Sequence, residues 1–493
     1  MRVRHVYGPG RAGMGMDKRA RWLALIVLCL GDLMIVLDGT IVNVALPSIR
    51  DDLGFTETSL AWVVNGYLLT FGGFLLLGGR LGDLFGQRRM FLIGIALFTA
   101  ASLACGLAGT QGLLVAARAV QGLGGALVSA VALSLIMTLF TEPAERAKAM
   151  GIFGFVLSGG GTAGVLLGGV LTDLFSWHWI FLVNIPVGVL VYLLSLRLLP
   201  DVRGTAEGRV DVGGAVAVTG ALMLAVFAIV NGNEAGWTSA RTLGLLGAAA
   251  ALLALFIWIE ARVPAPLMPL GLFRIRNVSA ANIVGVLMAA GLFAWFFFSA
   301  LYLQQILGYT PLEVGLAYLP SMVVWGGASL FSDRLVMRFG IRTPLVVGLA
   351  LMAVGLVLFA RTPVDGSLWD VLPGTVAIGL GAGIGFNPIL LAAMSGVAPT
   401  EYGLASGVVN TSFMMGGALG LAVLASVAAA RSDDLRSSGD DELVALNGGY
   451  HLAFLIGAVF TAAAAVVAAT LIRAEAPAHA PAGEPGASEA LPD

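Results

Sequence analysis

The sequence carries little charge for its length. Only 11% of its 493 residues are Asp, Glu, Lys or Arg, and 58% are hydrophobic, whereas a soluble domain carries about 25% charged residues. The net charge is −2 and no basic cluster is present, so the composition argues against nucleic acid as a partner. A mean hydropathy of +0.93 is typical of a protein that works in a lipid bilayer.

Clusters of residues that could catalyse a reaction or bind a metal or a phosphate are also scarce. Cys29 and Cys105 lie in apolar stretches and predict neither a disulfide framework nor a metal site. No phosphate-binding loop with a lysine is present, so we expect no cofactor and no ATP drive. A membrane-embedded enzyme would need a cluster of acids, His or Cys near one interface, and the histidines are scattered. A membrane sensor would need an appended soluble domain. We therefore expect no enzyme activity.

Long apolar runs, by contrast, fill the chain, and glycine is abundant at 67 residues, which suits close helix packing in lipid. Windows of about 20 apolar residues predict fourteen membrane spans. These are residues 22–46, 58–79, 90–109, 113–138, 147–172, 178–198, 212–231, 242–260, 278–303, 312–333, 343–360, 370–394, 402–428 and 449–472. With the N-terminus placed inside, 21 of the 27 Lys and Arg residues fall in the segments on the inner side of the membrane and five on the outer side, which predicts an even number of spans and two cytoplasmic termini.

We thus expect an all-α, polytopic membrane protein built from two six-helix bundles. The predicted parts are a cytoplasmic tail (1–21), a first bundle (22–198), an inner loop with two inserted helices and a linker (199–277), a second bundle (278–472) and a disordered cytoplasmic tail (473–493). The segment 429–448 is polar and predicts a long, mobile outer loop.

The first span holds two carboxylates, Asp32 and Asp38, within the stretch GDLMIVLDGTIVNVALP. A charge deep in hydrocarbon costs roughly 2.5–3.5 kcal/mol, so such residues usually face a bundle interior or a water-filled path. A rise of about 1.5 Å per residue puts Asp38 at the depth of Arg118 in the fourth span, so the two could pair. Six residues turn a helix by about 600°, which predicts that Asp32 and Asp38 lie on different faces.

Each of these acids has two interpretations. Asp38 could couple a proton or recognise a charged substrate, or it could form a structural pair with Arg118. Asp32 could carry a proton, or it could lie on a water-filled path or at a packing contact. The residue types alone leave both choices open.

A glycine-rich segment, GGRLGDLFGQRR, follows the second span. Its glycines permit a tight turn and its acid can accept hydrogen bonds from arginines. We interpret it as a clasp, with an ordinary cytoplasmic loop as the alternative; the residues concerned are Gly79, Asp83, Gly86, Arg88 and Arg89. The matching segment 333–342 of the second half has Met337 in place of Asp83, so we expect the main lock in the first half.

Small and polar residues mark further helix faces. Gly160, Gly164 and Gly168 recur every four residues, with Gly169 beside them, and predict close approach of another helix. Most polar residues within spans predict interhelical hydrogen bonds, Asn184 and Asn282 among them. A binding cavity could be lined by Asn43, Asn65, Gln121, Trp295, Trp325, Asn410 and Met414. The alternative for the aromatic residues is that they face lipid.

Several of these stretches resemble the major facilitator superfamily. The spacing G-x-x-x-D-x-x-G-x-R-R at 79–89 resembles its cytoplasmic signature, which in that family latches the two halves. Others resemble its fourteen-helix drug:proton antiporter branch: LDGTIVNVALP (37–47), RAVQGLGGA (118–126), WHWIFLVNIPVG (177–188) and GLASGVVNTSFMMGGALG (403–420). Val165 follows Gly164 where those antiporters carry Pro, and His178 stands where they usually carry Arg; Val165 weakens the inference of antiport.

The resemblance implies inverted repeats around a midplane cavity and proton-coupled export of small hydrophobic or cationic drugs, a multidrug efflux that would confer antibiotic resistance. Its expected partners are a small-molecule substrate, protons and the lipid bilayer, and we expect a monomer in the cell's inner (plasma) membrane, driven by the proton gradient. The alternative within this class is a dedicated exporter of one antibiotic or metabolite.

Overall fold

A computed structural model describes residues 17–200, 211–263, 266–397 and 402–473. The first half comprises α1 Lys18–Leu53, α2 Glu57–Phe85, α3 Gln87–Gly106, α4 Gln111–Leu139, α5 Pro143–Leu174, α6 Trp179–Leu182 and α7 Asn184–Leu198. The insert comprises α8 Val212–Val230, α9 Gly232–Ala235 and α10 Ala240–Glu260. The second half comprises η1 Leu270–Arg274, α11 Arg276–Leu301, η2 Tyr302–Ile306, α12 Pro311–Phe339, α13 Arg342–Phe359, α14 Leu368–Met394, α15 Tyr402–Ser437 and α16 Glu442–Leu471.

The predicted all-α, polytopic fold is confirmed. Thirteen helices in the described part of the chain are long and apolar enough to cross a membrane. The helix α5, whose described apolar stretch is the shorter Ala163–Leu174, supplies the remaining predicted span. The chain is therefore a multi-pass membrane protein.

Local sequence signals set several helix ends. A capping box starts α2, in which the Thr56 hydroxyl accepts from the Ser59 amide and the Ser59 hydroxyl accepts from the Thr56 amide. The same arrangement of Thr310 and Glu313 starts α12. Gly54 ends α1 with φ of +70°, a conformation that glycine adopts without steric cost. These caps satisfy backbone groups that have no partner within the helix itself.

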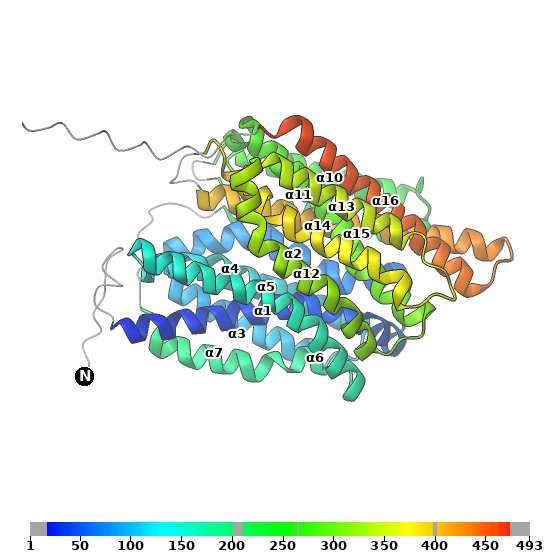
Figure 1. The fold of residues 1–493 in the computed structure, drawn as a ribbon, viewed down its shortest axis with the longest axis horizontal. Helices are drawn as coiled ribbons and strands as arrows, with labels where there is room; N and C mark the ends of the chain where they lie inside the picture. Colours follow the sequence, from blue (N-terminus) through cyan, green and yellow to red (C-terminus); the bar gives the residue numbers. More distant parts are fainter. Residues whose placement is uncertain (1–16, 201–210, 264–265, 398–401, 474–493) are drawn as a thin grey trace, which may run out of the picture.

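The helices pack as two groups with the insert against them (Figure 1). In the first half, α4 packs on α2 and α3, while α1 packs on α5; in the second half, α14 packs on α12 and α13, while α11 packs on α15 and α16. The helices α8 and α10 pack on each other, and α8 also contacts α2 and α15.

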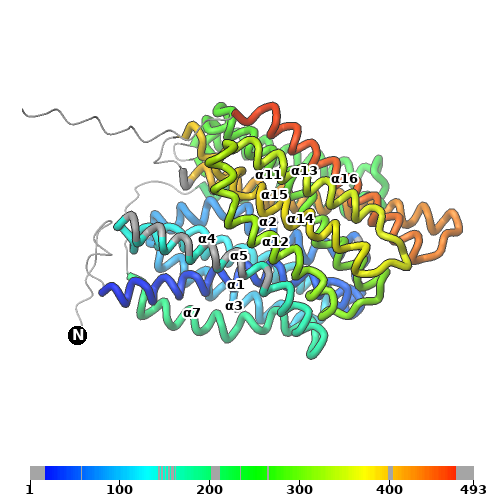
Figure 2. The backbone as a smooth tube through the Cα atoms, in the orientation of Figure 1, coloured from blue at the N-terminus to red at the C-terminus, as the bar shows by residue number. Residues whose placement is uncertain are grey.

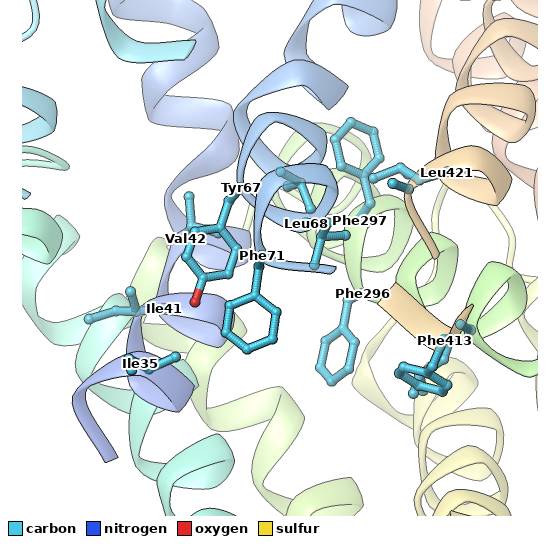
Figure 3. Packing of buried hydrophobic residues seen from close by; sticks show 14 of the residues in the cluster. Ile35, Ile41, Val42, Tyr67, Leu68, Phe71, Phe296, Phe297, Phe413 and Leu421 are labelled. Carbon is cyan, nitrogen blue, oxygen red and sulfur yellow. The ribbon is translucent and has the colours of Figure 1, made fainter. Parts of the chain in front are cut away.

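Two helix pairs join the halves, namely α2 with α15 and α5 with α12. A Cβ built on Gly72 of α2 would lie 2.9 Å from the Cβ of Met414, and one on Gly169 of α5 would lie 2.6 Å from the carbonyl oxygen of Pro311. The absence of side chains at these glycines therefore lets the α5 backbone touch the α12 backbone and the α2 backbone touch the Met414 side chain. Figure 3 shows apolar residues of α1 and α2 in one packed region with residues of α11 and α15.

The predicted outer loop at 429–448 was wrong. The segment 429–448 is mostly helical, because α15 runs to Ser437 and α16 starts at Glu442. Ion pairs one turn apart, Arg431–Asp434 and Arg436–Asp433, support the polar end of α15. Figure 2 shows this α15–α16 hairpin, orange to red, at the end of the molecule away from the N-terminus. The predicted sixth span matches the apolar span Trp179–Leu198, which comprises α6 and α7, and α11 begins at Arg276, two residues before the predicted ninth span.

The glycine face of α5 lies against α1, as its spacing predicts. A Cβ on Gly168 would lie 2.7 Å from the Ile41 carbonyl oxygen, and one on Gly164 would lie 2.9 Å from that of Leu37. A Cβ on Gly160 would meet the Leu33 side chain instead. Only hydrogen fits between the two backbones at Gly164 and Gly168, so α1 and α5 pack as a close pair.

The replacement Gly168→Ala should destabilise the protein by about 1–3 kcal/mol, because its methyl group would force the α1 backbone away. Thermal unfolding in detergent can be followed with a thiol-reactive dye, since Cys29 and Cys105 are buried and become reactive on unfolding. Gly161→Ala is the matched control, because a Cβ there meets nothing within 4 Å. Equal unfolding temperatures for the two variants would contradict the close packing.

Candidate functional site

Both acids of α1 are buried inside the first half. Asp38 is 1% exposed and Asp32 is 3% exposed. Each is therefore removed from water and depends on neighbouring side chains for its hydrogen bonds. The two residues meet different partners, and the partners define two sites.

Asp38 forms a buried ion pair with Arg118 of α4. The Arg118 Nη1 lies 2.5 Å from Asp38 Oδ2, and the arginine is itself 1% exposed. The pairing predicted from the depths of the two residues is thereby confirmed. Two amides also donate to Asp38 Oδ1: Gln121 Nε2 at 2.7 Å and Asn184 Nδ2 at 2.9 Å. Both carboxylate oxygens of Asp38 are thus satisfied.

Arg118 extends the network to further helices. Its Nε donates to the Val63 carbonyl oxygen of α2 at 2.9 Å, and its Nη1 also donates to Gln121 Oε1 at 2.7 Å. The guanidinium carbon lies 4.4 Å from the centre of the Tyr67 ring and 5.6 Å from that of Phe181. The aromatic faces attract the cation and shield the ion pair from water.

The serine Ser102 completes the network from α3. Gln121 Nε2 donates to its hydroxyl at 2.9 Å, and the same hydroxyl donates to the Phe98 carbonyl oxygen. The network therefore joins α1, α2, α3, α4 and α7 around one carboxylate. Sequence reasoning assigned no role to Ser102 or Tyr67, because serine in a membrane helix commonly bonds to its own helix.

The Asp38 network contains the groups that a proton exchange would need, a buried carboxylate and its cationic partner. A proton on Asp38 would remove its negative charge and weaken its attraction for Arg118, so the guanidinium would become free to meet another anion or to shift. A proton leaving Asp38 would restore the ion pair. The site therefore links the occupancy of one carboxylate to the packing of every helix that it joins.

Asp32 has fewer partners. The Ser129 hydroxyl of α4 donates to Asp32 Oδ1 at 2.6 Å, whereas Oδ2 has no hydrogen-bond partner among the described residues. The prediction that Asp32 and Asp38 face apart was incomplete, because both reach α4, at Ser129 and at Arg118. The helices α1 and α4 are in contact, so two faces of α1 can meet one neighbour at different depths.

The segment predicted to form a clasp, residues 79–89, is almost entirely helical. Residues up to Phe85 continue α2, and Gly86 alone separates α2 from α3, with φ of +97°. Gly79 lies inside α2, and a Cβ there would meet nothing within 4 Å. The prediction of a loop was therefore wrong, because a single glycine in the left-handed region makes the turn.

The contacts of this segment lie within the first half. Arg88 Nη2 donates to the Leu196 carbonyl oxygen of α7 at 2.5 Å, and Gln87 bonds to Ser134 of α4. Asp83 is exposed and forms no ion pair among the described residues, and Arg89 is exposed as well. In this conformation the segment fastens α3 to α4 and α7.

The proposed cavity residues are dispersed. Gln121 belongs to the Asp38 network, and Asn43 donates to carbonyl oxygens of its own helix. Asn65 is fully buried, and its amide has no partner among the described residues. Asn410 lines a small pocket between α14 and α15 with Phe386 and Phe413.

The remaining candidates lie in the second half or at its border. Trp295 is fully buried, with its ring 5.4 Å from that of Tyr318 and 6.2 Å from that of Phe359, in the core of that half. Met414 packs where α15 meets α2. Trp325 is partly buried on α12. These residues thus form no single wall with the Asp38 network.

Removal of the cation should destabilise the fold strongly. Arg118→Ala leaves Asp38 buried without its counter-charge, which should cost about 3–5 kcal/mol of unfolding free energy. The double variant Arg118→Met with Asp38→Asn should recover part of this loss, because no unpaired charge is left. The measurement is the same thermal unfolding in detergent, and losses that simply add in the double variant would contradict the ion pair.

Comparisons with known proteins agree with this geometry. The sequence matches the Major Facilitator Superfamily over residues 28–421. It is 41% identical over 463 residues to the puromycin resistance protein pur8 of Streptomyces alboniger, with 92% of each chain covered. It is 39% identical to the cephamycin export protein CmcT of Amycolatopsis lactamdurans, covering 86% and 88%. It is 38% identical to the multidrug resistance protein Stp of Mycobacterium tuberculosis, covering 84% and 76%.

Solved structures share the fold at low sequence identity. A bacterial homologue of the human lysosomal transporter Spinster, in an inward-facing and unoccupied conformation, superposes with a TM-score of 0.65 at 18% identity. The alignment covers 92% of this chain and 97% of that one. The sequence match, the close relatives and the common arrangement of helices lead to one conclusion: this chain belongs to the major facilitator superfamily of membrane transporters.

Proposed function

We propose that this protein exports small hydrophobic or cationic drugs across the plasma membrane in exchange for protons. The observation that carries the proposal is the 41% identity with a puromycin resistance protein over nearly the whole of both chains. Relatives named for cephamycin export and for multidrug resistance support the same activity. The substrate would be a small molecule, and the proton gradient would supply the energy.

The Asp38–Arg118 ion pair supports the assignment of the proton site. It is the one buried ion pair among the described residues, since the other pairs are at least partly exposed. Protonation of Asp38 would release Arg118 from a contact that joins helices on all sides of the first half. A proton that crosses the membrane supplies about 2.3 kcal/mol per 100 mV of potential, so one exchange can bias the conformational equilibrium.

The movement would take place at the α2–α15 and α5–α12 interfaces. Glycines bring the halves together there, and the Gln304 side chain adds a bond to the Val44 carbonyl oxygen of α1 at 2.8 Å. A change in the Asp38 network would reach these interfaces, because α2 forms one of them and α1 packs on α5, which forms the other. Alternating access would then follow from rocking of one half against the other.

Asp32 is the second candidate for the proton or for a cationic group of the drug. Its Oδ2 has no partner among the described residues, and its Oδ1 has a single hydroxyl donor. An acceptor with one open oxygen could receive either ligand. Asp38 is the stronger candidate for coupling, because its protonation would change more contacts.

A dedicated exporter of one antibiotic is the second candidate function. The specific observation in its favour is that several relatives are named for single antibiotics, among them puromycin, lincomycin and tetracenomycin C. The multidrug resistance protein of similar identity supports a broader range. The breadth of substrates therefore has to be measured.

Proteoliposomes with an acidic interior should accumulate ethidium when they contain the wild-type protein. A protonophore should abolish the accumulation, and Asp38→Asn should lower it at least about tenfold, because an amide cannot take up the proton that drives the step. Asp51→Asn is the matched control, since Asp51 lies exposed at the end of the same helix. Coupled transport that persists in Asp38→Asn but fails in Asp32→Asn would move the proton site to Asp32.

Expression in a bacterium that lacks its own drug pumps should raise resistance to several unrelated compounds if export is broad. Puromycin, lincomycin and ethidium form a suitable panel, with susceptibility as the measurement and Asp38→Asn as the inactive control. Protection against one compound alone would support the dedicated exporter. No protection against any of them, by protein shown to reach the membrane folded, would contradict drug export.

A further inference from the structure

Two carboxylates outside the Asp38 site meet at the ends of the inserted helices. Asp211 directly precedes α8, and Glu260 is the last residue of α10. Their exposures are 6% and 3%, so both are more than nine-tenths buried. Neither takes part in the export mechanism described above.

Each carboxylate has one satisfied oxygen and one unsatisfied oxygen. Asp211 Oδ1 accepts from the Gly214 amide at 2.8 Å and caps α8, while Glu260 Oε2 accepts from the Met268 amide at 3.0 Å. Asp211 Oδ2 and Glu260 Oε1 are buried and have no hydrogen-bond partner among the described residues.

The two unsatisfied oxygens both lie beside Gly214. A Cβ built on Gly214 would lie 2.4 Å from Asp211 Oδ2 and 2.9 Å from Glu260 Oε1. Two ionised carboxylates so close would repel each other, and neither could donate to the other. One proton between them would remove a negative charge and would supply the hydrogen bond that both oxygens lack.

No counter-charge replaces this proton among the described residues. The helix α8 has no charged residue, and the described charged side chains on α2 and the linker near this end are Arg80, Asp83, Arg262 and Arg274. Arg262 is exposed, with its guanidinium 4.4 Å from the Trp258 ring. The remaining charges of α10 and α15, at 241 and 431–436, lie at the far ends of those helices. None of these groups forms an ion pair with either acid.

The acid pair lies where the insert is tied to both halves. Asp211 ends the chain segment that arrives from the first half, and Met268 belongs to the linker that leads into the second half. Beside Met268, Leu267 packs with Ala215 of α8 and Leu77 of α2. Met268 itself packs in a cluster that includes Met415 of α15. The pair therefore holds the linker close to the α2–α15 interface.

We propose that Asp211 and Glu260 form a proton-binding site, in which one shared proton joins the two carboxyl groups and holds the linker at Met268 to the start of α8. The bound ligand is a single proton, and the site is separate from the Asp38 network. This inference does not depend on drug export, because it concerns the folded protein alone.

Thermal unfolding of the full-length protein in detergent, measured at about pH 6 and about pH 9, tests the proposal, because a proton that only the folded state holds stabilises it less as the pH rises. The unfolding temperature of the wild type should fall by several degrees more than that of Glu260→Gln. The glutamine amide can donate to Asp211 Oδ2 without a titratable proton. Asp211→Asn should behave alike, because its amide can donate to Glu260 Oε1 and its oxygen can still cap α8.

Glu145→Gln is the control for loss of a carboxylate. Glu145 pairs with Lys18 at 3.3 Å and Arg21 at 3.0 Å, so its replacement should destabilise the protein at both pH values. The proposal is overturned if both acid-pair variants keep the wild-type dependence on pH. It is also overturned if magnesium or calcium stabilises the wild type at the higher pH but not Glu260→Gln, since the site would then bind a metal cation. Because Glu260→Gln and Asp211→Asn are both measured, the test still holds if one of them does not fold.

Discussion

The first half of this transporter depends on one buried ion pair, between Asp38 and Arg118. Removal of two charges from water is costly, and the cost is recovered only where the geometry and the extra hydrogen bonds are good. Here Gln121, Asn184 and the Val63 carbonyl supply those bonds, and each comes from a different part of the half. The pair therefore sets the relative positions of the helices that contribute to it.

Small residues transmit this arrangement to the rest of the molecule. The glycine face of α5 holds α1 at backbone distance, and Gly169 on the same helix meets α12 of the other half. A shift of α1 would thus displace α5 and change the α5–α12 interface between the halves. Close packing without side chains favours rigid-body movement, because backbones in contact cannot absorb a displacement by changing rotamers.

Much of this architecture could be predicted from the sequence, because apolar length and the cost of buried charge act locally. The spans followed from hydropathy, and the Asp38–Arg118 pair followed from depth along two helices. Contacts that depend on how helices cross could not be predicted. The partner of Asp32 is Ser129, and a serine within an apolar span carries no signal of the helix that it will face.

The predictions of two loops were wrong for a related reason. The polar segment 429–448 was expected to be a loop, although charged residues also form helix where ion pairs and water satisfy them, as around Arg431 and Asp434. Only Gly86 of the predicted clasp leaves the helices, since a single left-handed residue suffices for the turn. The meeting of Asp211 and Glu260 depends on the packing of α8 on α10, which no local pattern encodes.

In the proposed mechanism, Asp38 exchanges a proton when the transporter binds its drug. The most direct measurement is the release of protons from purified protein in weak buffer when ethidium or puromycin is added, with a pH-indicator dye as the readout. We expect the wild type to release a proton when it binds the drug and Asp38→Asn to release none. Binding without release, or equal release by the wild type and by Asp38→Asn, would contradict it.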